Sequence, residues 1–96
     1  MPVEADLQKK CINHCKALNI LAYKVEAASQ RGFPDLLLVF PHGHVTFCEL
    51  KSPKGTGKLS PWQIRVRQQL RNNNADIFTT DSFAQFIDAV AGRLDP

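Results

Sequence analysis

The sequence predicts a single α/β domain, residues 1–96, in which helices flank a central mixed sheet. The chain has 96 residues, close to the usual size of one domain. Its apolar residues switch between a helical period and a strand period, in the order α-β-β-β-α-β-α. The segment Asp35–Phe40 (DLLLVF) is so continuously apolar that we expect it to be covered on both faces. Helices on either side of a sheet supply such cover.

The first half of the chain predicts one helix and three strands. An apolar stripe predicts a helix over residues 4–18, and its members, at spacings of four, four and three, are Leu7, Cys11, Cys15 and Leu18. Alternation over Leu21–Glu26 predicts a strand, and a Gly- and Pro-containing loop follows over 27–34. Strands over Asp35–Phe40 and His44–Leu50 then form a hairpin. The histidines beside its turn, His42 and His44, are expected to be exposed.

The second half predicts two helices around a fourth strand. Ser60-Pro61-Trp62-Gln63 opens the first helix as a capping box. Trp62, Val66 and Leu70 are expected on its buried side, and Asn72-Asn73-Asn74 ends it. The fourth strand is Asp76–Thr80, after which Asp81 or Ser82 caps the last helix. The apolar face of that helix comprises Phe83, Phe86, Ile87, Val90 and Leu94.

Composition narrows the class of protein. Hydrophobic residues make up 44% and charged residues 22%, which is typical of a folded domain. No apolar run approaches the roughly 18 residues of a membrane span, and the first ten residues lack the apolar stretch of a secretion signal. Three cysteines without such a signal favour a reducing compartment. Cys11 and Cys15 are expected to pack in the core, because no second ligand pair accompanies them.

The net charge of +3 conceals an uneven distribution. No acidic residue lies between Glu49 and Asp76. The cationic residues of that window are Lys51, Lys54, Lys58, Arg65, Arg67 and Arg71. An acid-free basic segment can bind the phosphates of a nucleic acid, or it can form a solvated basic face, and the charges alone do not separate the two.

The predicted hairpin brings two acidic residues together. A three-residue turn at 41–43 pairs Phe40 with His44 and therefore Asp35 with Glu49. Opposed residues project to the same face with Cβ atoms about 5 Å apart. Lys51, two residues beyond Glu49, joins that face, whereas Leu50 points to the core and leaves its backbone carbonyl available.

Two chemical interpretations of this arrangement stay open on spacing alone. The like charges of Asp35 and Glu49 repel unless a cation neutralises them, and their hard oxygen atoms suit Mg²⁺ or Mn²⁺. Two carboxylates, a lysine and open coordination positions suit phosphodiester hydrolysis. Alternatively, Asp35 caps a loop and Glu49 forms a surface salt bridge with Lys51 or another cation.

The motifs resemble a known nuclease family. Gly32-Phe33-Pro34-Asp35 followed by Glu49-Leu50-Lys51 resembles the PD-(D/E)xK signature, and the element order resembles that restriction-endonuclease-like core. Within that superfamily, Glu4, the approach to Asp35 from Arg31, and Leu59-Ser60-Pro61-Trp62-Gln63 resemble the VRR-NUC (virus-type replication-repair nuclease) family. The resemblance extends from Glu4 to about Leu94. It departs after the second helix, where members often have Gly and this chain has Asn73-Asn74-Ala75.

The resemblance implies roles for individual residues. Asp35 and Glu49 match the metal-binding carboxylates, with the backbone carbonyl of Leu50 as a further ligand. Lys51 matches the catalytic lysine. Glu4 matches an acid of the first helix that reaches the same site as a possible metal ligand. Gln63 matches a polar active-site residue of the second helix; the capping box offers a second explanation for it, and one residue can serve both roles.

The resemblance also implies a substrate. We expect a Mg²⁺- or Mn²⁺-dependent DNA endonuclease that acts as a homodimer on branched DNA, Holliday junctions in particular. Its expected location is the cytoplasm of a bacterial or phage-infected host cell. The expected contacts to the DNA backbone are Lys54, Lys58, Arg65, Arg67 and Arg71. The alternatives are a DNA-binding protein without catalysis and a nuclease for flaps or linear ends.

Overall fold

The chain folds into one four-stranded sheet and three helices. The structure is a computed structural model that describes residues 3–26, 30–51 and 59–94, with side chains from Asp6 onward. In chain order the elements are α1 (Val3–Ala17), β1 (Leu21–Lys24), β2 (Leu36–Val39), β3 (Val45–Leu50), α2 (Pro61–Asn72), β4 (Asp76–Thr80) and α3 (Phe83–Leu94). This order confirms the predicted one, with element ends shifted by one or two residues.

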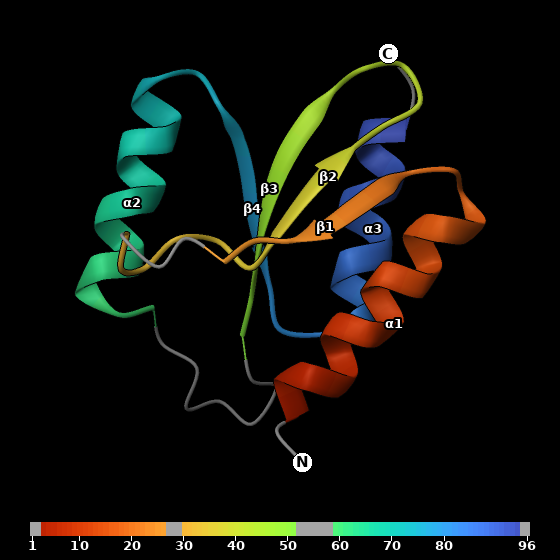
Figure 1. Ribbon diagram of the computed structural model, residues 1–96, viewed down its shortest axis with the longest axis horizontal. Helices are drawn as coiled ribbons and strands as arrows, with labels where there is room; N and C mark the ends of the chain where they lie inside the picture. The colour runs from red at the N-terminus through yellow and green to blue at the C-terminus, as the bar shows by residue number, and fades with distance from the viewer. Residues whose placement is uncertain (1–2, 27–29, 52–58, 95–96) are drawn as a thin grey trace.

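The sheet is mixed, as predicted. Its strand order is β1-β2-β3-β4; β2 runs antiparallel to both β1 and β3, and β3 runs parallel to β4. Helix α2 therefore forms the crossover that two parallel neighbours require. Figure 1 shows α1 and α3 together on one side of the sheet and α2 on the other, where α2 packs against β4. Among the described residues, no helix combines the length and apolar character of a membrane span.

The main core lies between the sheet and the α1–α3 layer. Alternate strand residues point into it, which is the pattern expected of a half-covered sheet. Its fully buried side chains include Leu36, Leu38, Phe40, Phe86 and Val90. Cys11, Cys15 and Cys48 are buried there as free thiols, which confirms core packing. Burial raises the pKa of Cys11 to about 12 and that of Cys15 to about 11, so both thiols stay protonated near neutral pH.

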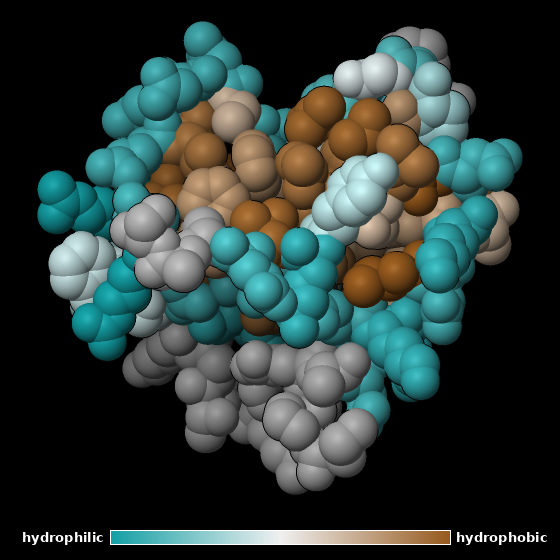
Figure 2. Space-filling model, viewed as in Figure 1, coloured by the Kyte–Doolittle hydropathy of each residue, from teal (hydrophilic) through white to brown (hydrophobic). Residues whose placement is uncertain are grey.

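The opposite face of the sheet is only partly covered, so the expectation that β2 is enclosed on both sides is wrong. Leu37 and Val39 are half-buried, because α2 packs over β4 and stops short of β1 and β2. On the same open face, Leu21 and Tyr23 are 54% exposed and Val45 is 44% exposed. Figure 2 shows the resulting apolar surface in the hollow between α2 and the outer strands.

Local signals set the ends of the helices as the sequence indicates. The hydroxyl of Ser60 accepts the backbone N–H of Gln63, and the Gln63 side chain accepts the backbone N–H of Ser60, which completes the capping box. Ser82 caps α3 by accepting the backbone N–H of Gln85. After α2, Asn74 adopts a left-handed conformation with φ of 64°. The asparagine thus does what glycine often does at this position.

Two sequence-based expectations about individual side chains are wrong. Helical spacing predicts Trp62 on the buried side of α2, yet it is 44% exposed, while Val66 is buried and Leu70 half-buried. Trp62 lies in the first turn of α2, where the guanidinium of Arg31 is 5.7 Å from its ring centroid. The second error concerns His44, which is not a freely exposed turn residue, because its Nε2 lies 2.8 Å from Oδ2 of Asp76.

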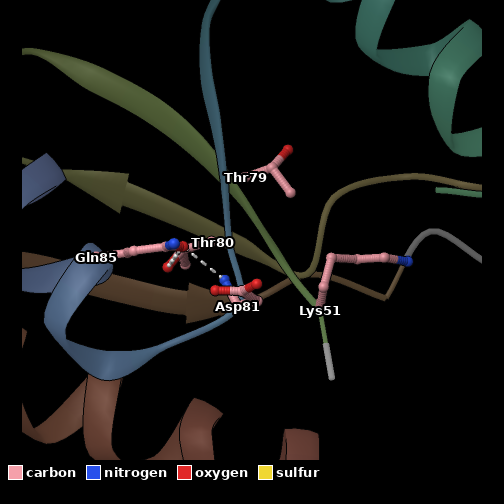
Figure 3. A pocket seen from close by; sticks show the side chains of 5 residues that line it. All are labelled: Lys51, Thr79, Thr80, Asp81 and Gln85. Carbon is pink, nitrogen blue, oxygen red and sulfur yellow. Dashed lines mark hydrogen bonds between the residues drawn. The ribbon is translucent and has the colours of Figure 1, made fainter. Parts of the chain in front are cut away.

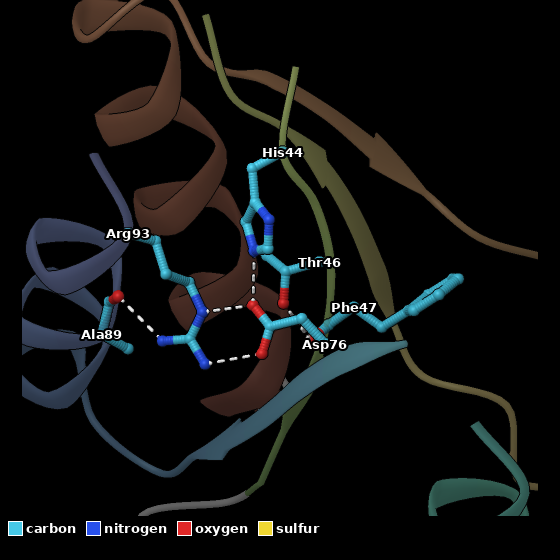
Figure 4. Close-up of polar contacts among 6 residues, drawn as sticks. All are labelled: His44, Thr46, Phe47, Asp76, Ala89 and Arg93. Atoms are coloured by element: carbon cyan, nitrogen blue, oxygen red, sulfur yellow. Dashed lines mark hydrogen bonds and ion pairs between the residues drawn. The ribbon is translucent and has the colours of Figure 1, made fainter. Parts of the chain in front are cut away.

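Asp76, at the start of β4, ties the sheet to α3. The Nε of Arg93 donates to its Oδ2 at 2.6 Å and Nη2 donates to its Oδ1 at 3.0 Å, while Nη1 donates to the Ala89 carbonyl (Figure 4). The Arg93 guanidinium also stacks 4.6 Å from the Phe78 ring centroid. These hydrogen bonds, with a smaller contribution from His44, hold the pKa of Asp76 well below its usual range.

This network predicts a pH-dependent stability. Because the folded-state pKa of Asp76 is depressed, its contribution is present above the unfolded-state value of about 4 and is lost as the pH falls toward the folded-state value. In urea unfolding, Asp76→Asn should therefore have a lower midpoint than the parent at pH 7, and the gap should narrow below about pH 4. A gap of constant size across that range would contradict this account.

Candidate active site

The hairpin register places the two predicted acids opposite each other. The observed pairs run from Val39 with Val45 to Leu36 with Cys48, and the Phe40 N–H donates to the His44 carbonyl at 2.8 Å. Extended by one residue, this register pairs Asp35 with Glu49, as predicted from the turn. Both carboxylates therefore lie on the sheet face opposite the main core.

Asp35 is fixed by the backbone of the strand that carries Glu49. Its Oδ2 accepts the Leu50 N–H at 2.7 Å, while no described residue hydrogen-bonds to its Oδ1. Leu50 itself is 3% exposed and belongs to the core, as predicted. The buried Leu50 side chain thus anchors the strand end that orients the Asp35 carboxylate.

Gln63 connects the second acid to the lysine. Its Nε2 donates to Oε1 of Glu49 at 2.8 Å, and its Oε1 accepts Nζ of Lys51 at 2.9 Å. The same Oε1 accepts the Ser60 N–H, so one amide caps α2 and organises the site. The two explanations offered for Gln63 are therefore compatible. Because an amide has distinct donor and acceptor ends, this bridge also fixes the orientation of both partners.

The carboxyl ends of the parallel strands complete this edge of the sheet. Thr79 is the partner of Glu49 in the β3–β4 register, so its side chain lies on the same face. Its hydroxyl is buried without a hydrogen-bond partner among the described residues. Thr79 also belongs to the lining of a small pocket, whose residues are Lys51, Thr79, Thr80, Asp81 and Gln85 (Figure 3). In that view the Lys51 side chain extends away from Gln85, and the Thr79 hydroxyl points toward α2.

Three predicted site residues fall outside what the structure describes. The backbone of Glu4 lies in the first turn of α1, but its side chain is outside the described part. In Figure 1, α1 begins at the end of the sheet where β3 finishes, which is the end that carries Glu49. Lys54 and Lys58 lie wholly outside the described residues.

The three arginines of α2 differ in their surroundings. Arg65 and Arg71 are exposed, whereas Arg67 is half-buried. Arg67 lies one turn after Gln63 and so shares its side of the helix. Its Nε is buried without an acceptor, and no ion pair between described residues involves it. An unpaired guanidinium in that position is suited to an anion supplied from outside the protein.

The donor set fits a hard divalent cation with an open coordination sphere. Asp35 and Glu49 offer carboxylate oxygens on one face, and Mg²⁺ commonly takes one or two carboxylates and leaves its other positions to water and phosphate. Within the described part of the chain, no group of three or more His, Cys, Asp or Glu side chains gathers as a metal cage. An open two-carboxylate site is thus the arrangement that these residues can form.

The sequence did not reveal how closely the loop before Asp35 contacts α2. Gly32 has φ of +84°, and a Cβ built on it would lie 2.5 Å from the Trp62 carbonyl carbon and 2.7 Å from the Gln63 nitrogen. The guanidinium of Arg31 lies 5.7 Å from the Trp62 ring centroid. The only available signal was the glycine itself, since glycine allows both a positive φ and a close backbone approach.

Comparison with known proteins places this geometry in a family. The sequence model of the VRR-NUC domain family matches residues 4–84, which include most of the chain and all of the residues that form the candidate site. The chain belongs to the VRR-NUC family. A solved VRR-NUC domain superimposes with a TM-score of 0.85 at 31% identity, covering 95% of this chain and 97% of that one. The "Putative nuclease p44" of Acyrthosiphon pisum secondary endosymbiont phage 1 is 29% identical over 79 residues, or 82% of this chain and 83% of that protein.

The VRR-NUC family match covers the residues of the candidate site. The family match includes Asp35 and the Glu49-Leu50-Lys51 segment, and it extends past Gln63 to the first turn of α3. The fold similarity spans the sheet and all three helices. Family, fold and a relative named as a nuclease together support a nuclease function.

Proposed function

We propose that this VRR-NUC domain is a Mg²⁺- or Mn²⁺-dependent deoxyribonuclease that hydrolyses phosphodiester bonds. The observation that supports the proposal best is the Gln63 bridge, whose amide holds Glu49 and Lys51 together on the sheet face that carries Asp35. An acid pair that binds a cation and a lysine beside it are the parts that phosphodiester hydrolysis needs. A fold alone would not support an activity, because unrelated functions share folds.

The proposed roles follow from the hydrogen bonds. Asp35 and Glu49 would hold the cation, with the Leu50 carbonyl and Glu4 as further candidate ligands. When bound, the cation supplies Lewis-acid stabilisation of the phosphate and lowers the pKa of a coordinated water. Lys51, held at 2.9 Å by Gln63 Oε1, keeps an ammonium beside the carboxylates. That ammonium positions the attacking water and offsets negative charge in the transition state.

The basic residues of α2 are proposed to bind the DNA backbone, and Arg67 is predicted to contribute most. A charged hydrogen bond contributes roughly 1.5–3 kcal/mol, so Arg67→Ala should weaken DNA binding about tenfold or more. Arg65→Ala, on the exposed side of α2, serves as the matched control and should have a smaller effect. Fluorescence anisotropy with labelled duplex in Ca²⁺ measures both constants. Equal losses in the two variants would contradict the special role of Arg67.

A homodimer is proposed, with the part of the open sheet face formed by β1, β2 and the start of β3 as its contact surface, away from the end of β3 that carries Glu49. That face carries Leu21, Tyr23 and Val45, each 44–54% exposed, and its positions in β1 and β2 include no charged residue. Exposed apolar patches of this kind mark interaction sites, and a two-fold dimer places the same patch on both subunits. Sedimentation equilibrium should show a dimer that Val45→Lys converts to a folded monomer. A monomeric parent protein would overturn this part of the proposal.

Branched DNA, Holliday junctions in particular, is the proposed substrate, because two symmetric sites can cut two strands of a four-way junction. A cleavage assay with Mg²⁺ or Mn²⁺ over junctions, flaps, nicked duplex and linear duplex tests both activity and preference. Asp35→Asn and Lys51→Ala are expected to abolish cutting of every substrate. Equal cutting of linear and branched DNA would overturn the branch preference. Binding without any cutting would favour a non-catalytic DNA-binding protein instead.

A further inference from the structure

Trp62 is an exposed aromatic side chain beside the proposed active site. Trp62 is 44% exposed at the start of α2. It is the only tryptophan of the chain. The next residue is Gln63, whose amide contacts both Glu49 and Lys51. Trp62 therefore adjoins a residue of the candidate site along the chain, and its own side chain does not pack in the core.

The backbone that carries this ring is held tightly. Gly32 lies so close to the Trp62–Gln63 peptide that no Cβ would fit there. Arg31, on the same loop, places its guanidinium 5.7 Å from the ring centroid, and no ion pair between described residues involves it. A fixed aromatic ring with an unpaired cation beside it matches the two parts of a nucleotide, a planar base and a phosphate.

Spacing relates the ring to the cleaved strand. Adjacent Cα atoms are about 3.8 Å apart, and stacked bases about 3.4 Å apart along a strand. Because Trp62 is one residue from Gln63, we take the base that meets its ring to belong to a nucleotide near the phosphate held at Glu49 and Lys51. In a continuous duplex both faces of that base are covered by its neighbours. Only a base at a branch, gap or end has a free face for the indole.

We propose that Trp62 and Arg31 form a subsite for an unpaired nucleobase next to the cleaved phosphodiester bond. Trp62 stacks on the base, and Arg31 orients the ring and contacts the adjoining phosphate. The inference rests on the proposed nuclease function and deepens it, since it gives the site a means to favour DNA with a disrupted stack.

The single tryptophan provides a direct test. Titration with a duplex that contains a three-nucleotide single-stranded gap, in Ca²⁺ to prevent cleavage, should quench the intrinsic fluorescence. The fully paired duplex of the same sequence should quench it much less. Equal quenching by the two duplexes, or none by either, would overturn the subsite.

Variants extend the test. Base–aromatic stacking contributes roughly 1–3 kcal/mol, so Trp62→Ala should lose about 5- to 150-fold in affinity for the gapped duplex and little for the paired one. Trp62→Phe should recover part of the loss, and Ile64→Ala, another exposed apolar residue of α2, should lose none. Circular dichroism verifies that each variant is folded, and anisotropy of labelled DNA measures affinity. Equal losses on both duplexes would overturn the proposal.

Failure of this inference is distinguishable from failure of the proposed function. Quenching and stacking without any cleavage in Mg²⁺ or Mn²⁺ would keep the subsite and remove the nuclease. Cleavage that is unaffected by Trp62→Ala on gapped and paired substrates alike would keep the nuclease and remove the subsite.

Discussion

Glu49→Gln is expected to reduce DNA cleavage by about 10³-fold or more. Glu49 is 4% exposed, and its Oε1 accepts a hydrogen bond from Nε2 of Gln63 at 2.8 Å. An amide oxygen can accept that same hydrogen bond, so the substitution keeps the packing and removes the negative charge. Loss of cation-based charge stabilisation amounts to several kcal/mol, and each 1.36 kcal/mol corresponds to tenfold in rate.

The same variant gives a readout that is independent of activity. A cation that binds only the folded protein raises its melting temperature. Mn²⁺ should therefore stabilise the parent protein but not Glu49→Gln. Glu26→Gln, at an exposed position, is the matched control and should behave as the parent in both assays. Retention of the Mn²⁺ shift by Glu49→Gln would remove Glu49 from the metal site.

The site could be predicted wherever local rules determine it. Turn length fixed the hairpin register, and with it the opposition of Asp35 and Glu49. Alternation along β3 placed Leu50 in the core and its two neighbours on the other face. The capping box located Gln63 at the start of α2. In each case the relevant contacts lie within a few residues or across one hairpin.

The errors concern how far one element covers another. An apolar run such as Asp35–Phe40 shows that β2 can be enclosed, but the extent of α2 over the sheet depends on where its crossover begins. Helical spacing placed Trp62 with Val66, yet only Val66 is buried, because spacing does not show at which turn of a helix its contact with the sheet begins. The Gln63 bridge joins residues 12 and 14 positions away, and no periodicity encodes such a contact.

Gly32→Ala is expected to be strongly destabilising, because Gly32 has a positive φ and packs directly against the backbone of α2 beside the site. A left-handed backbone costs a non-glycine residue about 1–2 kcal/mol, and forced overpacking typically adds about 1–3 kcal/mol. The methyl group would lie 2.5 Å from backbone atoms of Trp62, which cannot move aside as a flexible side chain would. We therefore expect a loss of about 2–5 kcal/mol in the free energy of urea unfolding.

Gly43→Ala separates the two contributions, because Gly43 has φ of +92° and no atom within 4 Å of the position that an added methyl group would take. This control should show only the backbone cost of about 1–2 kcal/mol. The difference between the two variants then measures the contact between the 31–32 turn and α2. The same contact fixes the position of the Gln63 backbone, and with it the hydrogen bond from the Gln63 side chain to Glu49. Any folded Gly32→Ala protein should therefore cleave DNA more slowly than folded Gly43→Ala. Equal stability and equal activity of the two variants would show that α2 can shift to accommodate the added methyl group without disturbing the site.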